Sequence, residues 1–95
     1  MGQAKNMSTE GKQLIDQLQH AQDTARELIQ HGLMPSEIVV SAGSTVIELS
    51  QSRQNRRLGG VQVGQICGPS GRFTRFIATF GEVRVVWVQP WEQSV

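Results

Sequence analysis

Arginine is the residue in this 95-residue chain whose type and spacing point most directly to a binding chemistry. Its guanidinium is planar and stays charged, so it can hold a phosphate or carboxylate through two parallel hydrogen bonds. Residues 51–95 contain six arginines, no lysine and two acidic residues, whereas residues 1–50 contain three basic and six acidic residues. The net charge of +1 therefore hides an acidic N-terminal half and a basic C-terminal half.

Two groups of arginines lie in contexts typical of nucleic-acid contacts. Residues 51–60, QSRQNRRLGG, surround three arginines with glutamine and asparagine, whose amides can bond to base edges or phosphates. Residues 72–76, RFTRF, alternate arginine with phenylalanine, as in strands that stack unpaired bases while holding the backbone. The predicted nucleic-acid-binding residues are Arg53, Arg56, Arg57, Arg72, Phe73 and Arg75.

Strand alternation divides the second group between two faces. Phe73 and Arg75 would share one face of a strand, and Arg72 and Phe76 would share the other. A simpler interpretation stays open for both groups, because a short basic loop is normally solvated and phenylalanines often serve the core. The chain would then be a protein-interaction module, an inhibitor or adaptor that acts through its helix face or a sheet edge.

Residues suited to catalysis or metal binding do not gather in the sequence. His20 and His31 fall on one predicted helix, eleven residues and about 16 Å apart, so they cannot share a metal ion. Nucleophilic catalysis needs an activated side chain, and Cys67 has no basic neighbour in the sequence. The glycine-rich stretches 59–60 and 68–71 lack a P-loop lysine and are expected to be turns. We therefore expect no enzyme, no metal and no cofactor.

Length and cysteine content favour a small intracellular domain. A chain of this size can bury roughly 60–70% of its unfolded surface in one core. A single cysteine cannot form an intramolecular disulfide, which favours a reducing compartment. We find neither an apolar run of membrane-spanning length nor an apolar signal-peptide segment. We expect a cytoplasmic protein without a membrane segment, with a disordered tail at residues 1–7 and one domain over residues 8–95.

Apolar residues recur at alternating spacings of three and four, which predicts a helix over residues 8–31. Ser8 or Thr9 can cap its start. Gly32 can take a left-handed conformation after its end, and Pro35 prevents its continuation. The apolar stripe covers the domain's own sheet in the simpler interpretation and forms a two-helix dimer seam in the alternative.

After Pro35 the apolar period changes to two, which is typical of strands. We predict strands at residues 37–41, 44–50, 61–66, 72–80 and 82–88, with a flexible loop at 51–60. The expected fold is α+β, a long N-terminal helix packed on a four- to five-stranded antiparallel sheet. The predicted core residues are Leu14, Leu18, Leu28, Ile29, Val46, Val63, Ile77, Val85 and Trp87.

The last two predicted strands are apolar on both faces, which indicates burial on both sides. One helix cannot cover both faces of a sheet. Two solutions follow: the sheet curls towards a small barrel, or its open face meets a second subunit. We favour the second solution and expect a homodimer.

Overall fold

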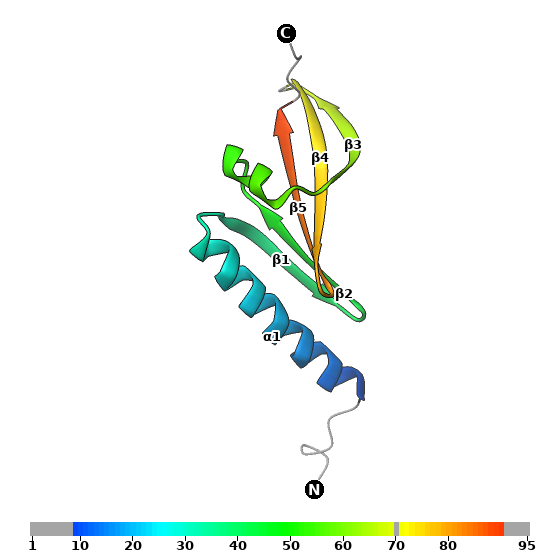
Figure 1. Cartoon of the computed structure of the whole chain (residues 1–95). Helices are drawn as coiled ribbons and strands as arrows, with labels where there is room; N and C mark the ends of the chain where they lie inside the picture. Colours follow the sequence, from blue (N-terminus) through cyan, green and yellow to red (C-terminus); the bar gives the residue numbers. More distant parts are fainter. Residues whose placement is uncertain (1–8, 70, 91–95) are drawn as a thin grey trace, which may run out of the picture.

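The computed structural model describes residues 9–69 and 71–90 and shows one helix packed on a five-stranded sheet (Figure 1). Its elements, in chain order, are α1 (Thr9–Gln30), β1 (Pro35–Ser41), β2 (Ser44–Leu49), the 3-10 helix η2 (Arg53–Leu58), β3 (Val61–Gly68), β4 (Gly71–Phe80) and β5 (Val83–Pro90). The α+β class and the five predicted strands are confirmed. The predicted tail at residues 1–7 and the candidate cap Ser8 lie outside the described residues.

The helix α1 ends as its glycine signal predicts. Gly32 has a φ of 84°, and its N–H donates to the carbonyl of Ile29 at 3.0 Å. The N–H of Leu33 donates to the carbonyl of Leu28 at 2.9 Å, which completes a Schellman motif. Leu28 and Leu33 both belong to the core cluster, so the motif turns the chain towards the sheet while burying both leucines.

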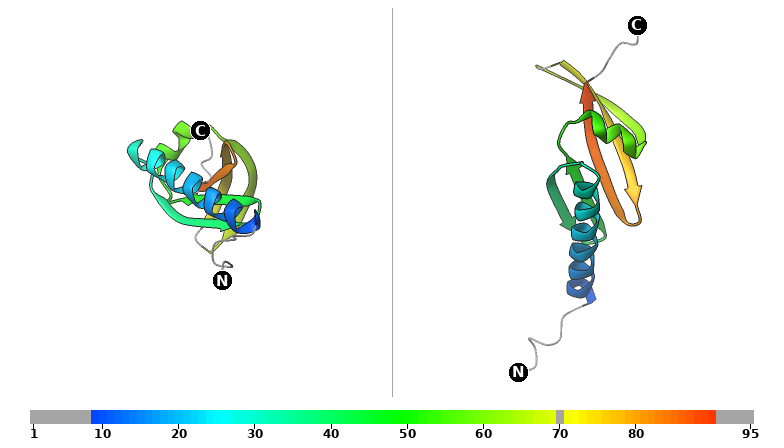
Figure 2. Two further views of the ribbon diagram at one scale, coloured as in Figure 1. Left: turned by 90° about the horizontal axis from the view of Figure 1, so that it is seen from below. Right: turned by 60° about the vertical axis from the view of Figure 1, so that its left-hand side comes forward.

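The sheet has the strand order β1-β2-β5-β4-β3 and does not close into a barrel, so β1 and β3 are its edges (Figure 2). Three neighbouring pairs are antiparallel, but β2 and β5 run parallel. The expectation of a fully antiparallel sheet was therefore wrong for the β2–β5 pair. A parallel pair needs a long connection, and here η2 and the β3–β4 hairpin form it. The sequence pattern does not reveal which earlier strand β5 rejoins.

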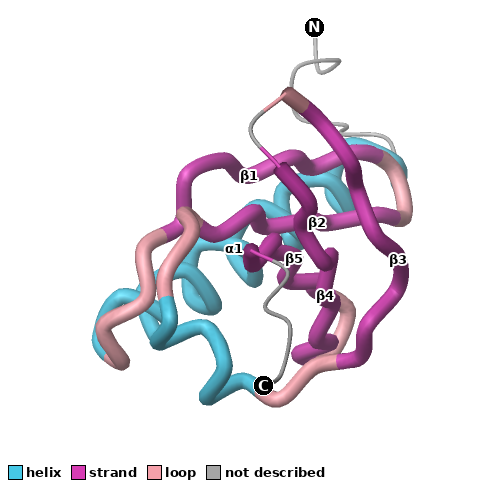
Figure 3. Tube along the Cα trace, turned by 90° about the horizontal axis from the view of Figure 1, so that it is seen from above, coloured by secondary structure: helices cyan, strands magenta, loops and turns pink. Residues whose placement is uncertain are grey.

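Register and burial distinguish two faces of the sheet. The face that we call the covered face lies beneath α1 and η2, which share one side of the sheet (Figures 2 and 3). The opposite, open face has no second layer over it among the described residues. The core cluster on the covered face consists of Ala25, Leu28, Leu33, Ile47, Leu49, Val83, Val85 and Trp87.

Burial of the predicted core residues is uneven. Three of them are buried: Leu28, Val85 and Trp87. Two are half-buried: Val46 and Ile77. Four predictions were wrong, because these side chains keep 39–53% of their surface exposed: Leu14, Leu18, Ile29 and Val63.

Small residues explain why so much of α1 stays exposed. Ala21 and Ala25 are 2% and 8% exposed and face the sheet, so α1 can approach the strands closely through them. The larger apolar side chains of the stripe then point beside the sheet rather than into it. Val63 is exposed for a different reason, because it lies at a bulge in the edge strand β3.

Within one copy of the chain, the last strands are buried on one face only. Burial alternates along β5, where the covered-face residues Val83, Val85, Trp87 and Gln89 are buried. On the open face Val86 and Val88 are only half-buried and Arg84 is exposed. One copy of the chain therefore supplies one covering layer, and a second layer from another copy stays a prediction.

Gln17 fixes the position of α1 along the strands. Its Nε2 donates to the carbonyl of Ser41 at 2.9 Å and to Oγ1 of Thr45 at 3.1 Å. Its Oε1 accepts from the N–H of Gly43 at 3.3 Å. Because Gln17 is buried, these bonds satisfy an amide that water does not reach, and they hold α1 over the β1–β2 hairpin.

Candidate nucleic-acid interface

The segment predicted as a flexible loop, residues 51–60, is built around η2. The side chain of Ser52 accepts from the N–H of Gln54 at 3.1 Å and caps this short helix. Asn55 is fully buried and donates from Nδ2 to the carbonyl of Ser50 at 2.9 Å. The loop prediction was therefore wrong for most of the segment. Ser52 caps the helix and Asn55 bonds to the chain before it, roles that composition alone does not distinguish from those of a loop.

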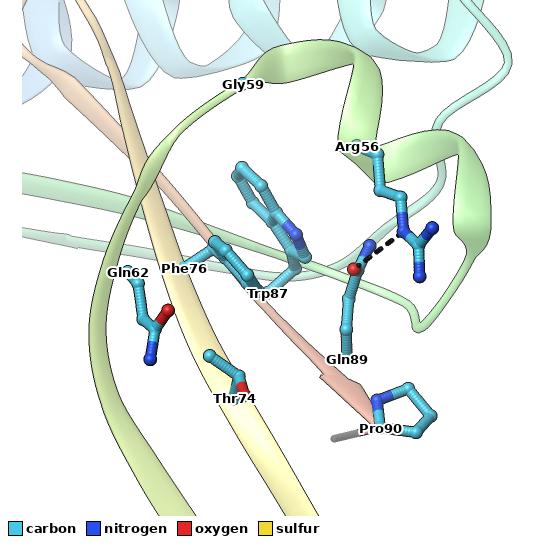
Figure 4. A pocket seen from close by; sticks show the side chains of 8 residues that line it. All are labelled: Arg56, Gly59, Gln62, Thr74, Phe76, Trp87, Gln89 and Pro90. Carbon is cyan, nitrogen blue, oxygen red and sulfur yellow. Dashed lines mark hydrogen bonds between the residues drawn. The ribbon is translucent and has the colours of Figure 1, made fainter. Parts of the chain in front are cut away.

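Gln89 of β5 ties η2 to the covered face. Its Oε1 accepts from the Nε–H of Arg56 at 3.2 Å, a bond drawn in Figure 4. Its Nε2 donates to the carbonyl of Ser52 at 3.4 Å. Gln89 is 7% exposed, so its amide needs these partners. The pair of bonds holds the guanidinium of Arg56 above the end of β5.

A hollow of about 490 Å³ lies between η2 and the strands β3, β4 and β5. Phe76 and Trp87 form its apolar floor, with ring centroids 5.7 Å apart and ring planes within 11° of parallel (Figure 4). Gln62 and Thr74 add an amide and a hydroxyl to its wall. The hollow thus combines a flat aromatic surface with hydrogen-bonding side chains and the positive charge of Arg56.

A second hollow, of about 360 Å³, adjoins the first, because both share Arg56, Gln89 and Pro90. Arg53 and Ser52 line its other side. We call the two hollows together the trough. The trough is bordered by η2 on one side and by the ends of the central strands on the other.

No acidic side chain lines the trough within the described part of the chain. The described acidic residues lie on α1, β1, β2 and the turn before β5. Arg72 pairs with Cys67 in register and lies two residues before Thr74, so it shares the covered face of β4 with the trough. Arg53, Arg56 and Arg72 therefore place three basic side chains at this end of the covered face.

The structure brings some of the predicted binding residues together and separates others. Arg53 and Arg56 line the trough, and Arg72 extends it along β4. Arg57 is exposed on η2 but does not line either hollow. The remaining two residues lie on the open face, opposite Pro90 and Val88 of β5: Phe73 and Arg75.

Of the residues that line the trough, sequence reasoning assigned only Arg53 and Arg56 to the site. Those that it missed include Gln62, Thr74, Phe76, Trp87 and Gln89. The alternation of side chains along β4 did indicate that Phe76 lies on the same face as Arg72. Nothing local indicated that η2 would lie over that face. Phe76 is consequently the aromatic residue of RFTRF that lines the same hollow as Arg56 of η2.

Trp87 supports the trough from below. Its side chain is 2% exposed, and its Nε1 is buried without a hydrogen-bond partner among the described residues. A ligand could not lie on this ring without displacing other atoms. Phe76 is half-buried, so its ring is the aromatic surface that a ligand in the trough can reach.

Comparison with protein families, with curated proteins and with solved structures found no match to this chain. Within residues 9–69 and 71–90, no helix combines the length and the hydropathy that a membrane crossing requires. The same residues contain no cluster of three or more His, Cys, Asp or Glu side chains placed to hold a metal ion.

Substitution of Gly60 can show how closely the backbone after η2 passes Trp87. A Cβ at Gly60 would lie 2.7 Å from Cη2 of Trp87, whereas a Cβ at Gly59 meets nothing within 4 Å. Both glycines have a positive φ, 74° and 75°, so left-handed strain is common to both. We expect Gly60→Ala to lower the free energy of unfolding in urea by about 1–3 kcal/mol more than Gly59→Ala does. Equal losses would contradict a tight contact with Trp87.

Proposed function

We propose that this chain is a non-enzymatic binding protein whose trough holds single-stranded nucleic acid, alone or within a nucleic-acid–protein complex. Arg53, Arg56 and Arg72 neutralise phosphates, while an unstacked base lies against Phe76. One observation carries the proposal. Arg56 of η2 lines the same hollow as the aromatic floor of distant strands, and Arg53 lines the adjoining hollow.

The polar side chains of the trough support nucleic acid over a simple anion. Gln62 and Thr74 present donors and acceptors beside the floor. Amide and hydroxyl groups of this kind bond to the edges of bases. A phosphate alone would need only the arginines, whereas a nucleotide uses the charge, the ring and the polar wall at once.

The shape of the trough favours a single strand over a duplex. The accessible ring, Phe76, lies at the bottom of a hollow of about 490 Å³. A paired base exposes only its edge in a groove, so it cannot place its flat face on a recessed ring. An unpaired base can rotate into the hollow, where stacking contributes roughly 1–3 kcal/mol.

Three further expectations remain part of the proposal. The chain acts without catalysis, which the exposed positions of His20 and His31, away from the trough, support. It works as a homodimer, which the many exposed apolar side chains support. It resides in the cytoplasm, which the unpaired thiol of Cys67 supports.

A protein-interaction module is the second candidate. The edge strand β3 is exposed along its whole length, and Val61 and Val63 keep 66% and 53% of their surface exposed. An apolar edge of this kind can pair with an extended segment of a protein partner. Such binding would change little with salt, whereas phosphate contacts weaken steeply as salt rises.

The arginines of β4 give a matched test because they lie on one strand and opposite faces. Binding of a labelled single-stranded DNA of about 12 nucleotides is measured by fluorescence anisotropy from about 50 to 200 mM salt. We expect Arg53→Ala and Arg72→Ala each to flatten the log–log slope by about 0.7, the share of one phosphate on a single strand. We expect the control, Arg75→Ala, to leave the slope unchanged.

Two outcomes of this titration contradict the proposal. The first is no binding of single-stranded DNA or RNA by the unaltered chain at the lowest salt. The second is a flattened slope for Arg75→Ala with an unchanged slope for Arg53→Ala and Arg72→Ala, because the phosphates would then lie on the open face.

The two phenylalanines of β4 separate stacking from charge. Phe76→Leu keeps most of the side-chain volume but removes the aromatic face, and Phe73→Leu makes the same change on the open face. We expect Phe76→Leu to weaken single-strand binding by roughly 5- to 150-fold, the equivalent of one stacked base, with an unchanged salt slope. Phe73→Leu should bind as the unaltered chain does. Unfolding curves of both variants serve as the control, and equal binding by both would exclude Phe76 as the stacking residue.

A further inference from the structure

One flank of α1, beside the core, forms an apolar groove with β1. The groove has a volume of about 710 Å³, and its walls include Leu18, Ala25 and Ile29 of α1 and Ile38 and Val40 of β1. Leu18 and Ile29 keep 51% and 53% of their surface exposed, and Ile38 keeps 43%. The apolar stripe of α1 is thus wider than the strip that the sheet covers.

The strand that borders this groove is an unpaired edge. Among the described residues β1 pairs with β2 alone, and its register is regular from Glu37 to Ser41. Proline, a residue that commonly protects an edge against pairing, occurs only at the first position of the strand, Pro35, where the register also shifts. The centre of the strand reads Ile-Val-Val and carries neither lysine nor proline. The opposite edge, β3, is interrupted by a bulge between Gln62 and Gly64, which makes it a poorer template.

We propose that a second copy of this chain docks here, with β1 paired antiparallel to β1 of the partner and α1 packed beside the partner's α1. This inference rests on the proposed homodimer and assigns its surface. A two-fold axis perpendicular to the sheet relates the copies, so the covered faces of both sheets stay on the same side. Each groove is then closed by the helix of the other copy.

The spacing of strands and helices fits this arrangement. The helix α1 lies over the β1–β2 hairpin and runs along it (Figure 1). Strands lie about 4.8 Å apart, so helices centred over the two hairpins would be separated by two strand spacings, roughly 10 Å. Packed helices have interaxial distances of about 8–10 Å. The strand pairing therefore brings the two α1 helices to packing distance without further adjustment.

The exposed apolar area supplies about half of the surface that a stable dimer buries. Three side chains that line the groove keep 43–53% of their surface exposed, Leu18, Ile29 and Ile38, and Leu14 and Ile15, one helical turn before Leu18, keep 39% and 43%. Together they offer roughly 400 Å² per copy, about half of the ~800 Å² that each partner buries in a stable interface. The unpaired backbone of β1 and the neighbouring Gln22 supply polar area for the remainder.

Charge argues against the open face as the dimer surface. Its apolar residues alternate with four charged ones, Glu37 and Glu48 from β1 and β2 and Arg75 and Arg84 from β4 and β5. Stacking two such sheets would desolvate these charges, which is costly unless each finds a partner. The α1–β1 groove contains one charged residue, Arg26, at its border.

Sedimentation equilibrium of the full chain at micromolar concentrations tests the proposal. We expect the unaltered chain to have twice the 10.5 kDa mass of one copy. Leu18→Glu places a charge in the groove at an exposed helical position, so it should give the single-copy mass while circular dichroism shows an unchanged fold. The control is Ile66→Glu, which changes an exposed apolar residue of the open face and should remain dimeric. Leu18→Gln provides a second, uncharged groove variant if the first does not fold.

Each contrary outcome identifies what has failed. A single-copy mass for the unaltered chain would overturn both the homodimer and its surface. A dimer that survives Leu18→Glu and Leu18→Gln, or that dissociates only with Ile66→Glu, would overturn this surface alone. Hydrogen exchange adds an independent criterion, because amides of residues 37–41 should exchange more slowly as the concentration rises through the dimer transition. No such dependence would exclude β1 pairing.

Discussion

The hydrogen bonds of Gln89 are the interaction on which the candidate site depends. One buried amide on β5 bonds to the side chain of Arg56 and to the backbone of Ser52, and so holds η2 against the covered face. The trough is the space that this attachment leaves between η2 and the strands. The same attachment requires a glycine at position 60, where the chain passes Trp87 too closely for a side chain. The attachment of η2 to β5 through Gln89 thus places Arg56 beside the aromatic floor.

The sheet is longer than its one helix can cover, and this constraint divides the molecule into two parts. The 22-residue α1 lies over β1 and β2, held there by Gln17, and leaves the other end of the covered face to η2. Most of the described acidic residues are on the α1 half, while the η2 half carries the trough arginines. The charge asymmetry along the sequence therefore becomes a separation in space, with an apolar groove at one end and a basic trough at the other.

Local signals predicted the elements well, and non-local contacts account for the differences. Gly32 and Pro35 marked the end of α1, and apolar alternation identified five strands. Neither signal shows which side of a wide stripe meets the sheet, so Leu18 and Ile29 were expected in the core and are exposed. The parallel pairing of β5 with β2 and the position of η2 join segments more than thirty residues apart. For that reason Phe76, rather than Phe73, lines the hollow beside Arg56.

An NMR titration of the ¹⁵N-labelled chain with a short single strand of mixed sequence tests the central claim most directly. The account predicts that the side-chain amide signals of Gln62 and Gln89 and the backbone signals of residues 53–58 shift in proportion to bound strand. It also predicts that raising the salt reverses these shifts. Shifts confined to open-face residues such as Val86, or no shifts at low salt, would contradict the claim that the trough beneath η2 is a binding site for single-stranded nucleic acid.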